Sequence, residues 1–73
     1  MSNYSREEVV ALLHHSLHHN QHHKEEMDDL CEAVNQLENI KAGKEMQQIL
    51  EKYDQITAHL KAVLKAVSTE DQI

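Results

Sequence analysis

The chain has 73 residues and a formal charge of −6, from 13 acidic and 7 basic residues with histidine neutral. A chain this short forms at most one domain and buries only a small core. The acidic balance disfavours nucleic acid and anionic membranes as partners, because binding to either needs clustered lysine and arginine. The sequence has no membrane-spanning apolar run, no signal-peptide pattern at its start and a single cysteine. We therefore expect a cytoplasmic protein.

The composition predicts an all-α fold, because the sequence has one glycine and no proline, phenylalanine or tryptophan. Ser5-Arg6-Glu7-Glu8 has the pattern of a capping box, which starts a helix. We expect one domain over residues 1–73, with a first helix over about 6–40 and a second over about 44–67. The hinge is expected at about 41–43, where Gly43 suits a left-handed helix cap.

Apolar residues recur at alternating spacings of three and four in both predicted helices. In the second helix the predicted stripe, widened by Leu50 and Leu64, consists of Met46, Ile49, Tyr53, Ile56, Leu60, Val63 and Val67. In the first helix the same spacing runs through Val9, Leu13, Ser16, Asn20, His23, Met27, Leu30, Val34 and Leu37. The middle of the first stripe is therefore polar.

Two helices with a short connection form an antiparallel hairpin, in which each helix has only one neighbour. Much of either stripe would then stay in water. We therefore expect two hairpins to associate into a four-helix bundle, as a homodimer or a higher oligomer. A loosely packed monomer is the alternative.

Residues 14–23, HHSLHHNQHH, hold six of the seven histidines. Side chains four residues apart lie on the same face of a helix. This segment contains four such pairs: His14/His18, His15/His19, His18/His22 and His19/His23. Two imidazoles at this spacing can bind one metal ion at about 2.0–2.1 Å from each nitrogen, although a tight site needs further ligands.

A helical wheel turns Asn20, Ser16 and His23 toward the apolar stripe and places His19 at its border. We therefore predict His19 and His23 as inner metal ligands. Glu26 is a candidate carboxylate ligand, and His59 is a candidate third nitrogen ligand if His23 lies opposite His59 or Leu60. The remaining candidates, for an ion bound at the surface, are His15 and His22, which the wheel directs to solvent.

An imidazole-rich site suits nickel, zinc, cobalt or copper, and the ligands do not choose among them. Asn20 has a second interpretation, since one polar residue in an apolar seam can fix helix register and oligomeric state. Cys31 lies in the packed half of the wheel, so we expect a small buried hydrophobe there rather than a reactive thiol.

The run from His19 to Glu26, HNQHHKEE, resembles the His-Asn-x-x-His-x-Glu-Glu signature of a small uncharacterised helical-hairpin domain of anaerobic bacteria and archaea. The similarity extends from the apolar lead-in over residues 9–17 to the second helix, and so covers most of the chain. Some members accompany nickel-handling accessory proteins. The resemblance therefore implies a metal-related role carried by His19, Asn20 and His23. The other histidines of the run depart from the signature, as does Ile56-Thr57, where the family has Gly-Asn.

The sequence thus favours a small metal-binding helical bundle that handles or senses a transition metal. The alternative is a structural or interaction module whose polar core layer sets oligomer register and whose acidic exterior meets a protein partner. A pH-responsive assembly is a third possibility, because seven protonated histidines would change the charge from −6 to about +1. An enzyme is not expected, since the chain shows no nucleophile–base constellation and no phosphate loop.

Overall fold

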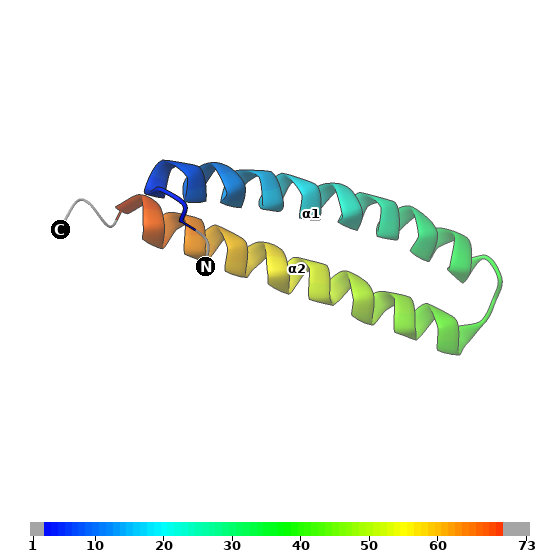
Figure 1. The fold of residues 1–73 in the computed structure, drawn as a ribbon. Coiled ribbons are helices and arrows are strands. Elements are labelled where there is room, and N and C mark those ends of the chain that lie inside the picture. The colour runs from blue at the N-terminus through cyan, green and yellow to red at the C-terminus, as the bar shows by residue number, and fades with distance from the viewer. Residues whose placement is uncertain (1–2, 70–73) are drawn as a thin grey trace.

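The protein, seen in a computed structural model, is described over residues 3–69. Two α-helices, α1 (Arg6–Asn35) and α2 (Ile40–Thr69), pack against each other along their length. They form an antiparallel hairpin with a longest dimension of 53 Å (Figure 1). The all-α hairpin expected from the sequence is confirmed. Residues 1–2 and 70–73 of the predicted domain lie outside the described part of the chain.

The predicted capping box at the start of α1 is confirmed. The Ser5 hydroxyl accepts a hydrogen bond from the Glu8 backbone N–H at 3.2 Å. The Glu8 carboxylate accepts one from the Ser5 backbone N–H, also at 3.2 Å. These two bonds pair donors that a helix start leaves without partners, which fixes where α1 begins.

The connection between the helices lies at residues 36–39, and not at the hinge predicted for 41–43. The backbone of Glu38 adopts the left-handed conformation, with φ of 58°, which reverses the chain. The Asn39 side chain then accepts a hydrogen bond from the Ala42 backbone N–H at 3.0 Å and caps the start of α2. The sequence signal for the start of α2 is therefore Asn39, which caps the helix, and not Gly43.

Gly43 lies inside α2 with an ordinary negative φ, so it is not the left-handed cap that the sequence suggested. A Cβ at this position would lie 2.7 Å from the Asn35 side-chain oxygen. The glycine thus leaves room for the last turn of α1, where the two helices approach each other beside the connection.

The helices meet along an inner seam of residues that are mostly half-buried and spaced alternately three and four apart. On α1 the inner seam consists of Val10, Leu13, Leu17, Asn20, Lys24, Met27, Cys31 and Val34. On α2 it consists of Gly43, Met46, Leu50, Tyr53, Thr57, Leu60, Leu64 and Val67. Within residues 3–69 only Cys31, at 7% exposure, counts as a buried apolar residue, as expected for its position. The hairpin alone therefore has almost no dry core.

The predicted stripes were right at every second position and wrong by one residue at the others. Leu13, Asn20, Met27 and Val34 do lie in the inner seam, but Ser16 is exposed and Leu17 takes its place. On α2, Leu50, Thr57 and Leu64 take the seam positions in place of Ile49, Ile56 and Val63, so the two leucines that were predicted to widen the stripe lie in the seam itself. The three β-branched residues stay 37%, 47% and 47% exposed.

A polar layer at mid-length gives the physical reason for this shift. The Asn20 amide donates hydrogen bonds to the Thr57 hydroxyl at 2.7 Å and to the Tyr53 carbonyl oxygen at 3.3 Å. With Ile56 in the seam instead, the half-buried amide would meet a hydrocarbon and lose the hydroxyl partner. The Asn20–Thr57 pair therefore selects which stripe of α2 faces α1.

The register of the two helices differs from the one expected from the sequence. A contact between the Lys24 ammonium and the Asp54 carboxylate at 2.7 Å agrees with Asn20 lying level with Thr57. His23 therefore lies near the level of Asp54. The expectation that His23 lies opposite His59 or Leu60 is wrong, because these residues are more than one helical turn farther along α2.

Replacement of Asn20 by alanine is expected to lower the free energy of unfolding by about 1–2 kcal/mol, because Thr57 loses a half-buried partner. The double variant Asn20→Leu/Thr57→Val removes both polar groups. Its free energy of unfolding is expected to lie within about 1 kcal/mol of the wild-type value. Urea denaturation followed by circular dichroism measures both values. A double variant that is less stable than Asn20→Ala would contradict this role for the pair.

The Gly43→Ala variant is expected to raise the free energy of unfolding by about 0.5–1 kcal/mol. Alanine favours the helix by about 1 kcal/mol over glycine, and the atom in the way is the movable end of the Asn35 side chain. Thermal denaturation of Gly43→Ala, with Gly43→Ala/Asn35→Ala as the control, provides the measurement. Destabilisation that Asn35→Ala fails to relieve would show that the backbones themselves need the glycine.

Candidate functional site

Two imidazoles of α1 converge at mid-helix. The Nε2 atoms of His19 and His23 lie 2.8 Å apart, and the two rings meet edge to face with their centroids separated by 4.3 Å. The helix itself creates this arrangement, since residues four apart stand one turn above each other. The contact is a hydrogen bond in which the Nε2–H of one ring donates to the Nε2 lone pair of the other, so an ion bound by both nitrogens would take the place of the shared proton.

A carboxylate approaches the same cluster from the next turn. Glu26 Oε1 lies 3.8 Å from His23 Nδ1 and 3.5 Å from His22 Nε2. A negative charge beside Nδ1 favours the tautomer with its proton on that nitrogen and leaves Nε2 able to bind a metal. Glu26 is thus better placed to orient His23 than to share a metal with it.

The neighbouring histidines are arranged around this pair at the surface. The His15 ring stacks on the His19 ring with a centroid separation of 6.0 Å. His15 and His22 are exposed, as the helical wheel predicted, and so is His18. The wheel also turned Asn20 inward, which is confirmed, but the Asn20 amide is engaged by α2 and stands apart from the imidazole pair.

The described residues contain no group of three or more His, Cys, Asp or Glu side chains that could hold a metal ion. Within one chain, His19, His23, Glu26 and His59 therefore do not form the four-donor set considered from the sequence. What the chain supplies is a two-nitrogen half-site with a carboxylate behind it. Half-sites of this kind bind metals weakly until further ligands arrive.

An ion pair that the sequence pattern did not predict crosses the inner seam beside the histidines. Lys24 occupies a seam position between Asn20 and Met27, and its ammonium reaches Asp54 on α2. The hydrogen bond to Asp54 and the charge of that carboxylate, with a smaller contribution from Asp28, raise the pKa of Lys24 above its usual 10.5. An apolar repeat pattern cannot reveal such a residue, because lysine breaks the pattern.

The raised pKa of Lys24 makes the stability of the hairpin sensitive to alkaline pH. The ion pair contributes fully below pH 10.5, and its contribution is lost as the pH rises through the higher value in the folded state. We expect the unfolding free energy to fall more between pH 9 and about pH 11.5 in the wild type than in Asp54→Asn. Urea denaturation at both pH values tests this, with Glu51→Gln as the control. Equal losses in wild type and Asp54→Asn would refute the link.

An exposed apolar stripe flanks the imidazole pair on α1. This outer stripe consists of Val9, Leu12, Ser16, His19, His23, Glu26, Leu30 and Ala33. Leu12 is 45% exposed and Leu30 is 47% exposed, so both ends of the outer stripe present hydrocarbon to water. The histidines occupy its centre.

The exposed β-branched residues of α2 lie on the same side of the hairpin. Ile49, Ile56 and Val63 each precede an inner-seam residue by one position, as do His23 and Leu30 on α1. In an antiparallel pair of helices, residues that precede a seam residue by one position lie on the same side of the pair, whichever helix carries them. The hairpin thus carries one broad face with apolar ends and an imidazole pair at its middle.

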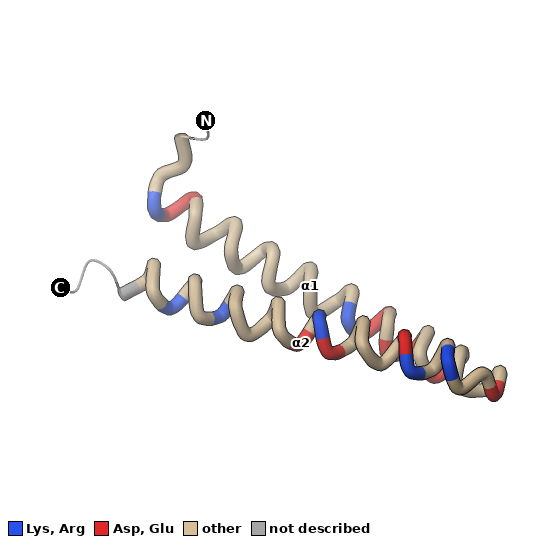
Figure 2. Tube along the Cα trace, turned by 90° about the horizontal axis from the view of Figure 1, so that it is seen from below, with Lys and Arg blue, Asp and Glu red and all other residues tan. Residues whose placement is uncertain are grey.

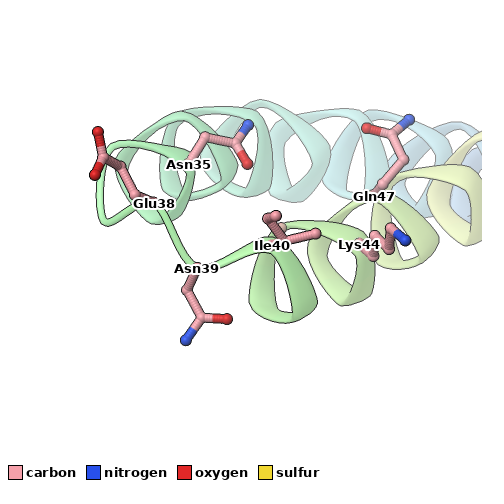
Figure 3. A pocket seen from close by; sticks show the side chains of 7 residues that line it. Asn35, Glu38, Asn39, Ile40, Lys44 and Gln47 are labelled. Carbon is pink, nitrogen blue, oxygen red and sulfur yellow. The ribbon is translucent and has the colours of Figure 1, made fainter.

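The other side of the hairpin holds a hollow beside the connection. It has a volume of about 340 Å³ and opens between the end of α1 and the first turns of α2 (Figure 3). Its lining residues are Asn35, Glu38, Asn39, Ile40, Gly43, Lys44 and Gln47. No histidine contributes to it, so the hollow is separate from the imidazole pair.

Charge is distributed unevenly along the hairpin. Acidic and basic residues are concentrated in the half near the connection, whereas α1 between Glu8 and Lys24 contains none (Figure 2). The histidine run fills this uncharged stretch. Over the described residues, neither helix is long and apolar enough to cross a bilayer.

Comparison with known proteins places the chain in a family. Searches of curated proteins and of solved structures return no significant match. A family model described as a domain of unknown function (DUF8180) matches residues 9–67, a range that includes the histidine run, the connection and nearly all of α2. Because this match spans most of the chain, the protein belongs to that family.

Proposed function

We propose that the protein binds a divalent transition metal through His19 and His23 and serves in metal handling or sensing in the cytoplasm, without catalysis. The observation that carries this proposal is the approach of the two Nε2 atoms to 2.8 Å on an exposed helix face. Two imidazoles held this close would bind one ion with little rearrangement, because the helix already holds their directions. Nickel, zinc, cobalt and copper all accept such ligands.

The surroundings of the pair support the proposal. The Glu26 carboxylate lies near His23 Nδ1, where its charge favours a proton on that nitrogen. His15 and His22 provide further nitrogens that can receive an ion before it reaches the His19–His23 pair. The resemblance of residues 19–26 to a signature associated with nickel handling points the same way.

The functional form in this proposal is a homodimer or a higher oligomer, with hairpins paired into a four-helix bundle. The described part of one chain leaves eight large apolar residues exposed and buries only Cys31 among its apolar residues. Association of two hairpins would cover the apolar face and supply the core that one chain lacks.

Isothermal titration of Ni²⁺ and Zn²⁺ into the metal-free protein at about pH 7.5 tests the proposal, since imidazole binds metals in its neutral form. We expect the affinity to fall at least tenfold in His19→Ala/His23→Ala. The matched control is His14→Ala/His18→Ala, which removes an i,i+4 pair from the exposed side and leaves the predicted ligands in place. An unchanged affinity in the first variant, or an equal loss in the control, would refute a site at His19 and His23.

The second candidate function is an interaction module without metal. The Asn20–Thr57 layer favours it, because a satisfied polar layer at mid-seam is a known device for fixing register in helical bundles. In that case His19 and His23 would join a hydrogen-bond network with a protein partner, and the acidic half near the connection would contact basic residues. Helicity and oligomer size that stay unchanged in chelator, together with no heat of metal binding, would favour this candidate.

A further inference from the structure

We propose that two copies of the chain share one metal ion at a two-fold axis, where His19 and His23 of each copy provide four nitrogen ligands. This inference rests on the proposed metal function and adds its stoichiometry and geometry. One chain offers two imidazole nitrogens, and no third donor completes a metal group within its described residues. A second copy of the same chain would supply the two further nitrogen ligands.

The outer stripe of α1 is symmetric about the level of Gln21, midway between His19 and His23. Leu12 and Leu30 lie equally far from this level, as do Val9 and Ala33. When two α1 helices pair antiparallel about a two-fold axis at Gln21, Leu12 therefore meets Leu30 of the partner subunit, and His19 meets the partner's His23. Ser16 meets the partner's Glu26, where a hydroxyl can donate to a carboxylate.

The exposed apolar residues of α2 are spaced symmetrically about the same axis. Asn20 lies level with Thr57, so the antiparallel direction of α2 puts Ile56 level with Gln21. Ile49 and Val63 lie equally far from Ile56. The axis would therefore place Ile56 against its own copy and Ile49 against the partner's Val63.

An apolar hollow of about 230 Å³ lies on this part of α2, lined by Ile49, Lys52, Tyr53 and Ile56. In the shared-axis arrangement the segment of the partner's α2 between Ile56 and Val63 would lie over this hollow. The hollow, the exposed branched residues and the symmetric spacing thus all lie on the one surface that the two-fold axis would cover.

A second copy fits this face better in the antiparallel arrangement than in the alternative with both connections at one end. The alternative stacks α1 on α2 and sets His19 and His23 beside the partner's Ile56 and the partner's His59, which would supply three imidazole nitrogens to an ion where the antiparallel arrangement supplies four. It also brings both charge-rich halves together, whereas the antiparallel arrangement sets the acidic half of α1 against the uncharged half of its copy (Figure 2).

The size of the face is sufficient for a stable dimer. The hairpin measures 53 × 21 × 20 Å, so one broad side offers an area on the order of 1,000 Å² per chain. Stable homodimers bury at least about 600–1,000 Å² per partner. The second copy would thus cover most of the exposed apolar side chains at once.

The spacing of the nitrogens suits a four-coordinate ion. At about 2.0–2.1 Å per bond, the ligands of a tetrahedral metal stand about 3.3 Å apart. The His19 and His23 Nε2 atoms, now 2.8 Å apart, reach this separation by small ring rotations. Two such pairs from opposite sides close a tetrahedron around one ion, for which Zn²⁺ and Co²⁺ are suitable.

The test combines metal stoichiometry with an interface variant that leaves every ligand intact. Co²⁺ or Zn²⁺ is titrated into the full chain, the mass is followed by sedimentation equilibrium, and the Co²⁺ complex is examined by visible absorption. The variant Leu12→Glu/Leu30→Glu places charge on two exposed positions of the outer stripe, so the fold of a single hairpin is expected to be retained. Ala11→Glu/Ala62→Glu adds the same charge at exposed alanines off the outer stripe as the matched control, and circular dichroism verifies the helicity of both.

We expect one ion per two chains, the intense visible bands of four-coordinate Co²⁺, and at least a tenfold loss of affinity in Leu12→Glu/Leu30→Glu but not in the control. One ion per single chain, lost in His19→Ala/His23→Ala and unaffected by Leu12→Glu/Leu30→Glu, would overturn the shared site while preserving metal binding by the pair. Metal binding that is absent, or that survives in His19→Ala/His23→Ala, would overturn the proposed function and the shared site together.

Discussion

The hydrogen bond from the Asn20 amide to the Thr57 hydroxyl is the contact on which the arrangement of the molecule depends. It lies at mid-length in a mostly apolar seam, where an unpaired amide would destabilise the hairpin. It therefore decides both the register of the helices and which side of each helix faces the other. The surface that remains exposed, including the imidazole pair, follows from that choice.

The sequence of α2 contains two overlapping stripes that share Met46, Tyr53, Leu60 and Val67. On α2 one stripe adds Leu50, Thr57 and Leu64, and the other adds the β-branched set Ile49, Ile56 and Val63. The hairpin uses the stripe that contains the hydroxyl group and leaves the fully apolar one in water. A small chain with almost no buried core thereby keeps hydrocarbon available for association. On α1 the corresponding exposed stripe holds His19 and His23 at its centre, so contact between copies and metal binding would concern the same surface.

The sequence was sufficient to predict the all-α hairpin and the start of α1, because composition, periodicity and the capping box are local signals. It was also sufficient to predict that Asn20 turns inward and that Cys31 is buried. The connection was misplaced, since Gly43 is a stronger general helix stop than Asn39, and here the asparagine side chain caps α2. Periodicity alone could not choose between two stripes that share residues, because the choice depends on the contact between Asn20 and a residue on the other helix.

The candidate site was predictable only in part, for related reasons. The i,i+4 spacing of His19 and His23 follows from helix geometry and is seen in the structure. The position of His59 relative to α1 depends on the register of the two helices, which could not be predicted from the sequence. The prediction that His59 lies opposite His23 was therefore wrong. Glu26 was recognised as a carboxylate near the pair, but its place beside His23 Nδ1 depends on side-chain directions that spacing does not specify.

The central claim, that the outer stripe meets its own copy about an axis at Gln21, is tested most directly by one distance. A spin label at Glu38→Cys in a Cys31→Ala background marks the connection of each hairpin in the metal-loaded protein. Pulsed dipolar spectroscopy should give a separation on the order of 50 Å, since antiparallel copies place the connections at opposite ends of helices that rise 1.5 Å per residue. A separation below about 30 Å would put both connections at one end and contradict the shared axis.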